Sequence, residues 1–309
     1  MRRVGIFGAG FGLYGYLPAM IRAGADRIVM PSRYRETFAR RSELQPFASC
    51  IDWAESDDAV LHGADAVVIA RVPVQQPRIV ERAFAAHGVR RFILEKPLAP
   101  SPAAALALQE TLRASGSRWR IAYVFRFTRW GKSLRTLCHA TEAGEKAERV
   151  RLQWTFHAHH FRHNLDNWKR HHEEGGGVLR FYGIHVIALL AELGYDDVLR
   201  SHMTGSPGQP ERWSAAFSGP GMPLFELEVD TRAESTCFEV MADGGGRSHV
   251  IAHLPDPFAE VAGEGDLDPR ITPLAELCRS LWDEQAAPVA WYGAALDLWS
   301  RTEAATLAE

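Results

Sequence analysis

Apolar and polar positions alternate in two different rhythms along the chain. Up to about residue 122, short runs that are apolar throughout alternate with amphipathic stretches of helical period. Strands that are apolar on both faces are typical of a parallel sheet covered by helices. The expected strands are 4–7, 27–30, 66–70, 91–94 and 118–123, and the expected helices are 16–24, 34–41, 78–87 and 102–114. The pattern predicts a Rossmann-type α/β domain over residues 1–122.

After residue 122 the rhythm changes to longer runs in which apolar and polar residues alternate. Turns rich in Gly, Pro and Asp, at 205–210, 219–223 and 243–246, separate several of these runs, as in an antiparallel sheet. The expected strands are 148–157, 213–218, 224–231, 235–241 and 247–253, and the expected helices are 129–142, 272–284 and 289–307. We predict an α+β domain over 123–309 with an open, mainly antiparallel sheet. The last helices are expected to pack back on the first domain.

Length and charge narrow the class of protein. A chain of 309 residues is long enough for two domains. Its formal net charge of -3 provides no basic field for nucleic acid or for an anionic membrane. The four cysteines are widely scattered, which is typical of reduced thiols in a cytoplasmic protein. Only four of the basic residues are lysines, so a lysine within a motif stands out.

A glycine-rich turn follows the first expected strand. Gly8, Gly10 and Gly12 lie between an apolar run and an apolar helix, and Phe11 lies among them. In this strand–turn–helix context, glycines let the backbone approach the pyrophosphate of a dinucleotide, and the helix N-terminus provides N–H donors. Leu13 occupies the third glycine position of the fingerprint, which is therefore incomplete. With the βα units that follow, the turn favours dinucleotide binding.

The end of the second strand bears on which dinucleotide is bound. An Asp or Glu at this place usually contacts the ribose hydroxyls of NAD. Here the strand leads into Ser32 and Arg33, a hydroxyl and a guanidinium that could hold a 2′-phosphate. The alternative is a solvated basic helix face. We expect NADP(H) to be favoured, with NAD(H) possible.

Further motifs give the chain a resemblance to a known family. Leu94-Glu95-Lys96-Pro97-Leu98 ends the fourth expected strand of the first domain, and Ala70 and Pro73 follow the strand before it. Farther on, Trp168-Lys169-Arg170 precedes Gly175-Gly176-Gly177 and then Gly183-Ile184-His185. With the glycine-rich start, these motifs resemble the glucose–fructose oxidoreductase / inositol dehydrogenase family (Gfo/Idh/MocA). The resemblance extends over nearly the whole chain.

The resemblance implies roles for individual residues. Lys96 and His185 correspond to the acid/base pair at the nicotinamide and the substrate hydroxyl, and both are also expected to bind substrate. Hydride transfer between C–OH and C=O requires a proton to move and positive charge near the oxygen, which a lysine and a histidine can provide. The residues expected to contact the cofactor are Gly8, Gly10, Phe11, Gly12, Ser32, Arg33, Ala70, Pro73, Glu95, Lys96, Trp168 and Arg170.

The chain also departs from the family pattern. Family dehydrogenases usually carry an Asp four residues before the final His, and here that residue is Phe181. Tyr16 and Gln76 likewise stand where His is common, and Ala188 stands where a second Asp is often found. Either His185 works alone, or Tyr182 or Asp166 substitutes, or the reaction is not ordinary alcohol oxidation, or catalysis has been lost. We include Tyr182 as a third candidate catalytic residue.

Two other features have several interpretations. Seven of the 13 histidines lie between residues 157 and 185, and this segment could hold a metal, line a site for anionic groups or be plain surface. No Cys or carboxylate stands at ligand spacing, so we expect no metal. Arg126, in an aromatic segment after the last parallel strand, could bind substrate or form a structural ion pair.

The sequence therefore predicts an NAD(P)-dependent oxidoreductase of the cytoplasm. Its expected substrate is a hydroxyl, carbonyl or imine of a polar, possibly anionic, small molecule such as a sugar or nucleotide-sugar. The resemblance also implies a homo-oligomer, a dimer or tetramer. The alternatives are a dinucleotide-binding regulator or sensor without turnover, and a redox-neutral enzyme that uses the cofactor transiently.

Overall fold

The computed structural model describes residues 2–140, 147–261, 263, 266–283 and 289–307, and it divides into two compact units. The first unit comprises Met1–Ala99, Ala107–Val124 and Val261–Ala287. The second comprises Pro100–Leu106, Phe125–Glu260 and Pro288–Glu309. The expected helices 129–142 and 272–284 end at residues that lie outside the described ones.

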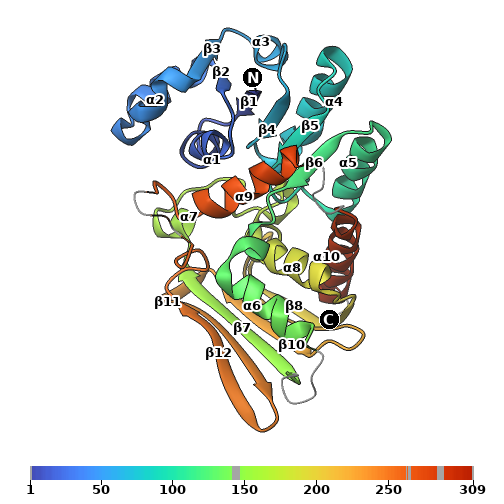
Figure 1. Ribbon diagram of the computed structural model, residues 1–309. Helices are drawn as coiled ribbons and strands as arrows, with labels where there is room; N and C mark the ends of the chain where they lie inside the picture. The colour runs from blue at the N-terminus through green and yellow to red at the C-terminus, as the bar shows by residue number, and fades with distance from the viewer. Residues whose placement is uncertain (1, 141–146, 262, 264–265, 284–288, 308–309) are drawn as a thin grey trace. The chain divides into compact units, whose positions relative to one another are not determined.

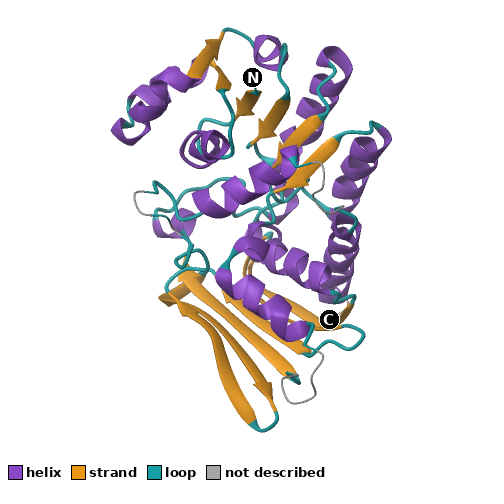
Figure 2. Ribbon diagram, in the orientation of Figure 1, coloured by secondary structure: helices purple, strands orange, loops and turns teal. Residues whose placement is uncertain are grey.

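The first unit is built on a parallel sheet of six strands in the order β3-β2-β1-β4-β5-β6 (Figures 1 and 2). The strands are almost entirely buried in the middle of the sheet, as their uninterrupted apolar sequences require. They are β1 (Arg3–Phe7), β2 (Arg27–Pro31), β3 (Ile51–Ala54), β4 (Ala66–Ile69), β5 (Arg91–Leu94) and β6 (Arg118–Ile121). The predicted Rossmann-type α/β domain is confirmed.

Helices connect these strands and cover the sheet. Helix α9 reaches the unit from late in the chain and packs on α1, β5 and β6. One π-helical turn, Gly12–Tyr16, leads directly into α1. The helices are α1 (Leu17–Arg22), α2 (Arg35–Ala39), α3 (Asp57–Leu61), α4 (Gln76–His87), α5 (Pro102–Ala114, its second half in this unit) and α9 (Ile271–Trp282).

The second unit is an open sheet of six strands in the order β12-β11-β7-β10-β9-β8. Only the β7–β10 pair is parallel, so the predicted mainly antiparallel sheet is confirmed. The strands are β7 (Arg149–His157), β8 (Asp197–Ser206), β9 (Gln209–Ser218), β10 (Leu224–Asp230), β11 (Arg232–Gly244) and β12 (Arg247–Leu254). Helices α6 (Arg129–Cys138), α8 (Ile184–Leu193) and α10 (Trp291–Leu307) lie along one face, and a short helix, α7 (His159–Arg162), follows β7.

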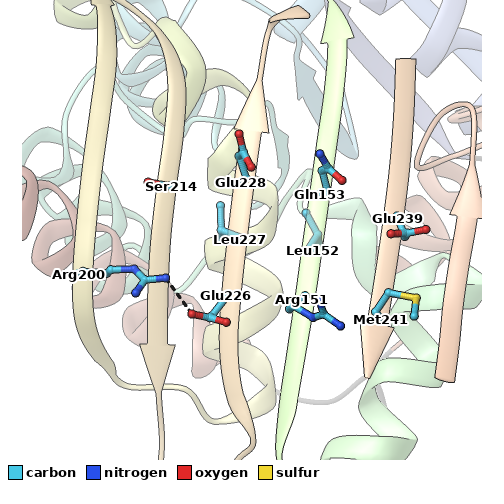
Figure 3. Close-up of a pocket in the computed structure, with 10 residues that line it drawn as sticks. All are labelled: Arg151, Leu152, Gln153, Arg200, Ser214, Glu226, Leu227, Glu228, Glu239 and Met241. Atoms are coloured by element: carbon cyan, nitrogen blue, oxygen red, sulfur yellow. Dashed lines mark hydrogen bonds and ion pairs between the residues drawn. The ribbon is translucent and has the colours of Figure 1, made fainter. Parts of the chain in front are cut away.

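The two faces of this second sheet differ sharply in polarity. The rings of Trp213, Phe217, Phe225 and Phe238 are buried in the core. The opposite face carries charges, with Arg200 donating to Glu226 at 2.8 Å (Figure 3). A shallow depression of about 340 Å³ on this face is lined by Arg151, Leu152, Gln153, Arg200, Ser214, Glu226, Leu227, Glu228, Glu239 and Met241. None of these residues belongs to the predicted site.

Some elements were not predicted from the sequence. Strand β3, helix α3, strand β8 and helix α8 are absent from the expected elements, and residues 205–210, expected to be a turn, mostly belong to β8 and β9. A helical stretch among the described residues, His172–Leu193, is also long and apolar enough to cross a membrane by length and composition alone. Because 83% of its most apolar window is buried inside the structure, it resembles the core helix of a folded domain.

Candidate functional site

The carboxyl ends of the central parallel strands bring the predicted cofactor residues of the first unit to one edge of its sheet. The glycine-rich turn follows β1, Ser32 follows β2, Ala70 follows β4 and Glu95 follows β5. In open α/β sheets, ligands bind at this edge, where the strand order reverses. Here the reversal lies between β1 and β4, next to the turn.

The glycine-rich turn fits the pyrophosphate of a dinucleotide. A Cβ on Gly8, whose φ is +146°, would lie 2.5 Å from the carbonyl oxygen of Ala70, so only glycine can stand there. A Cβ on Gly10 would meet no heavy atom within 4 Å, so open space lies beside the backbone at this residue. The turn is therefore tight against β4 on one side and open on the other, as a phosphate cradle requires.

Two buried polar side chains hold the segment that carries Lys96. The hydroxyl of Tyr16 donates to Oε1 of Glu95 at 2.6 Å. Nε2 of Gln76 donates to the carbonyl oxygens of Glu95 and Pro97, both at 2.9 Å, and to that of Leu98 at 3.3 Å. Both Tyr16 and Gln76 are fully buried. The residues that stand where the family often has His are thus positioning residues for the lysine segment.

The electrostatic setting of this segment follows from the same contacts. Burial raises the pKa of Tyr16 well above its usual value, and the negative charge of Glu95 raises it further. The phenol therefore remains a proton donor to Glu95 across the physiological range. Lys96 is half-buried, and the Lys96–Pro97 peptide bond is cis.

Ser32 and Arg33 contact carboxylates on the segment that follows β3. The hydroxyl of Ser32 donates to Oε2 of Glu55 at 3.2 Å. Arg33 forms an ion pair of 2.7 Å with Asp57, and its guanidinium lies 5.0 Å from the centre of the Tyr34 ring. Carboxylates are thus present near the expected ribose site, although they come from beyond β3 rather than from the end of β2.

In the second unit, the triple-glycine segment packs directly on the Trp168–Arg170 segment. A Cβ on Gly176 would lie 2.1 Å from the carbonyl oxygen of Trp168. The backbone N–H of Gly177 donates to the carbonyl of Lys169 at 2.8 Å. The glycines are therefore needed for close approach of two backbones, and this contact fixes the position of Trp168. Nη2 of Arg170 donates to the carbonyl of His160 at 2.7 Å.

Phe181 extends an aromatic cluster in place of the expected carboxylate. Its ring packs edge-on against Trp168 with centroids 5.2 Å apart, and Nζ of Lys169 lies 5.3 Å from its centre. On the other side it contacts Tyr182 at 4.7 Å. Tyr182 also packs against Phe156 at 4.8 Å, and all four rings of this cluster are half-buried.

His185 is buried at the start of α8 and is held by rings. Its imidazole stacks on Phe125 with centroids 4.8 Å apart and planes 25° apart. Phe258 contacts it edge-on at 6.4 Å. Asp166, one of the predicted substitutes for the missing Asp, is exposed and pairs with Nε2 of His171 at 2.7 Å. Arg126 forms an ion pair of 2.7 Å with the buried Glu192, which also pairs with Arg135.

The histidine-rich segment has no ligand set for a metal. Among the described residues, no group of three or more His, Cys, Asp or Glu side chains could hold a metal ion. His160, within this segment, is buried, and burial lowers its pKa to about 4, with further lowering by the charges of Lys169 and Arg170. It is therefore neutral at physiological pH.

Comparison with known proteins agrees with this geometry. Residues 2–123 match the family described as "Oxidoreductase family, NAD-binding Rossmann fold", Gfo/Idh/MocA. Residues 2–123 therefore resemble the NAD-binding domain of this family. The resemblance predicted from the sequence is thereby confirmed, and the glycine-rich turn lies within the matched Gfo/Idh/MocA region. No curated protein matches the chain.

Solved structures share the fold over the whole chain, and we compare three of them. GenD2 from gentamicin A biosynthesis, in complex with NAD, superposes with a TM-score of 0.74 at 16% identity over 98% of this chain and 93% of its own. A myo-inositol dehydrogenase from Corynebacterium glutamicum gives 0.72 at 16% identity over 100% and 97%. UDP-N-acetylglucosamine 3-dehydrogenase GnnA from Acidithiobacillus ferrooxidans gives 0.68 at 16% identity over 99% and 97%. At this identity the likeness shows that the chain shares their fold.

Proposed function

We propose that the protein is an NAD(P)-dependent oxidoreductase that interconverts a hydroxyl and a carbonyl, or an imine, of a sugar or nucleotide-sugar. The observation that carries this proposal is the placement of Lys96. The lysine lies at the same sheet edge as the phosphate-binding turn, on a segment held by Tyr16 and Gln76. Holding a charged side chain in a fixed place next to a cofactor is what an acid/base role requires.

The cofactor and the protein residues contribute different parts of the chemistry. Bound nicotinamide supplies the hydride acceptor or donor. Lys96 stabilises negative charge on the substrate oxygen and exchanges a proton with that oxygen. His185 is the second residue that carries a proton. Tyr182 is a further candidate, since its ring belongs to the aromatic cluster that contains Phe181. The substrate class is supported by GnnA and the inositol dehydrogenases among the similar structures.

We also propose a preference for NADP(H). The end of β2 carries no carboxylate, and the exposed guanidinium of Arg33 can form a charge-assisted hydrogen bond with a 2′-phosphate. Asp57 competes for the same guanidinium, and the charge of Glu55 opposes a phosphate near Ser32. We therefore expect NADPH to bind about tenfold more tightly than NADH, which corresponds to the lower range for one charged contact.

Titration of cofactor fluorescence tests the cofactor proposal. Arg33→Ala should remove the preference for NADPH and leave NADH binding unchanged. The control is Arg35→Ala, which replaces the next arginine along the chain, an exposed one, and should preserve the preference. Glu55→Gln should increase NADPH affinity because a repulsive charge is lost. Equal affinities for the two cofactors in the unmodified protein would contradict the NADP(H) preference.

Turnover separates an enzyme from a binding protein. Phe181 lies where a carboxylate completes the family site, and this favours a regulator or sensor as the second candidate. NADPH consumption should be followed with a panel of keto-sugars and nucleotide-linked keto-sugars. Oxidation of NADPH by at least one of them supports the enzyme, and tight NADPH binding with no consumption across the panel supports the sensor.

A further inference from the structure

We propose that Arg270, a residue outside every motif of the sequence, binds the pyrophosphate of the dinucleotide. The proposal rests on the cofactor binding described above and adds a residue to it. Arg270 lies far from the glycine-rich turn in sequence, yet it belongs to the first unit and immediately precedes α9. Its guanidinium carbon lies 4.1 Å from the centre of the Phe11 ring.

The Phe11 ring is a fixed platform for this guanidinium. It packs so closely along the first helix that a Cβ on Gly15 would lie 2.4 Å from its Cε2 atom. Tyr14 and Tyr16 contact the same ring edge-on, with centroids 5.3 and 5.4 Å away. Phe11 directly follows Gly10, where the backbone faces open space, so the platform borders the phosphate cradle.

Asp268 fixes the orientation of Arg270. Nε and Nη2 donate to the two carboxylate oxygens of Asp268 at 2.7 and 2.6 Å, and the backbone N–H of Arg270 donates to Oδ1 at 2.9 Å. No described residue accepts a hydrogen bond from Nη1 of Arg270. The side chain keeps 37% of its surface exposed, so donors remain for a ligand.

The chemistry of these donors selects a phosphate group. A guanidinium pairs with phosphate oxygens through charge-assisted hydrogen bonds, and ring stacking reduces the freedom that it loses on binding. The backbone N–H groups of the turn would hold the pyrophosphate beside Phe11. Arg270 therefore adds the cationic contact on the same phosphates, and it does so for NADH and NADPH alike.

Direct binding measurements test the proposal without relying on turnover. Arg270→Gln should weaken the binding of NADH, NADPH and ADP-ribose by at least about tenfold each, which is the scale of one charge-assisted contact. It should change AMP binding by less than about twofold, because AMP lacks the second phosphate. The binding of NADH should also become less sensitive to added NaCl. Arg279→Gln, which removes an exposed arginine from α9, is the matched control and should leave all four affinities unchanged.

The outcomes separate this inference from the proposed function. If the unmodified protein binds no dinucleotide, the proposed function fails; if it binds NADH and Arg270→Gln binds it equally well, only the role of Arg270 fails. A loss confined to NADPH would also overturn the inference, because it would assign Arg270 to the 2′-phosphate. Thermal unfolding without ligand shows whether the variant is folded. If it is not, Arg270→Lys is used, which keeps the positive charge but lacks the forked guanidinium. This variant should weaken the binding of NADH and ADP-ribose by several-fold.

Discussion

Lys96 in the first unit and His185 in the second are held by different kinds of interaction. The segment of Lys96 is fixed by hydrogen bonds from Tyr16 and Gln76, two polar side chains with no exposed surface. His185 packs against rings, with Phe125 stacked on it and Phe258 at its edge. Buried hydrogen bonds depend on individual atoms, whereas aromatic packing depends on shape and volume. Small chemical changes should therefore affect the lysine segment more than the histidine.

The largest expected effect comes from the lysine itself. Lys96→Met keeps the length of the side chain but removes its charge and proton, and turnover should fall by two or more orders of magnitude. NADPH affinity should change by less than about threefold, since the glycine-rich turn is untouched. Steady-state kinetics with fluorescence titration measures both quantities. Lys132→Met, at an exposed position on α6, is the control, and retention of most of the activity in Lys96→Met would make the lysine structural.

Gln76 offers a sharper test of the hydrogen-bonded segment. Gln76→Leu preserves the volume but leaves the carbonyls of Glu95, Pro97 and Leu98 without their donor. Unfolding free energy should drop by about 2–3 kcal/mol, and kcat should fall about tenfold because Lys96 is less well placed. Gln76→His, which retains a donor, should recover part of the kcat. The adjacent Gln75→Leu is exposed and should cost less than about 0.5 kcal/mol.

A matching decrease in stability without any change in kcat would contradict the positioning role. It would mean that Gln76 supports the fold and that Lys96 finds its place by other contacts. Denaturant titration and kinetics on the same preparations distinguish the two results.

A smaller effect is expected from pH on the second unit. The pKa of His160 is lowered to about 4 in the folded protein, first by burial and then by the charges of Lys169 and Arg170. The unfolded chain therefore binds more protons between about pH 6.5 and pH 4, and stability falls as the pH falls through this window. The loss attributable to His160 should be about 3 kcal/mol, since one pKa unit corresponds to about 1.36 kcal/mol. His160→Gln should flatten this part of the stability profile, and His249→Gln, at an exposed position, should not.

The sequence predicted the parts of the fold whose patterns are regular. The central strands of the first sheet are uninterrupted apolar runs, and each was recognised. Edge strand β3 was missed because only Ile51 of its four residues is buried. Helix α8 was missed because it is apolar on all sides, so it has no polar face to set the helical period. Strand β8 was missed because only Ser201 among its ten residues is buried.

The sequence likewise predicted only some residues of the candidate site. Local backbone geometry requires glycine in the turn, so the motif there was recognised, and the family resemblance identified Lys96. Tyr16 and Gln76 could be noticed only as departures from a family pattern, since their partners lie at Glu95 and beyond. Arg270 had no sequence signal, because its place on Phe11 depends on how α9 returns to the first unit.

The strand order of the second sheet has a consequence for the nascent chain. Strand β7 lies between β10 and β11, and both of its neighbours come later in the sequence. At about 5–20 residues per second, the ribosome needs several seconds to make residues 158–223 before the first of these partners emerges. During that interval β7 has two open edges that could pair with another chain. The exposed charges of Arg149 and Arg151 along it oppose such pairing, and they remain on the open face once the sheet is complete.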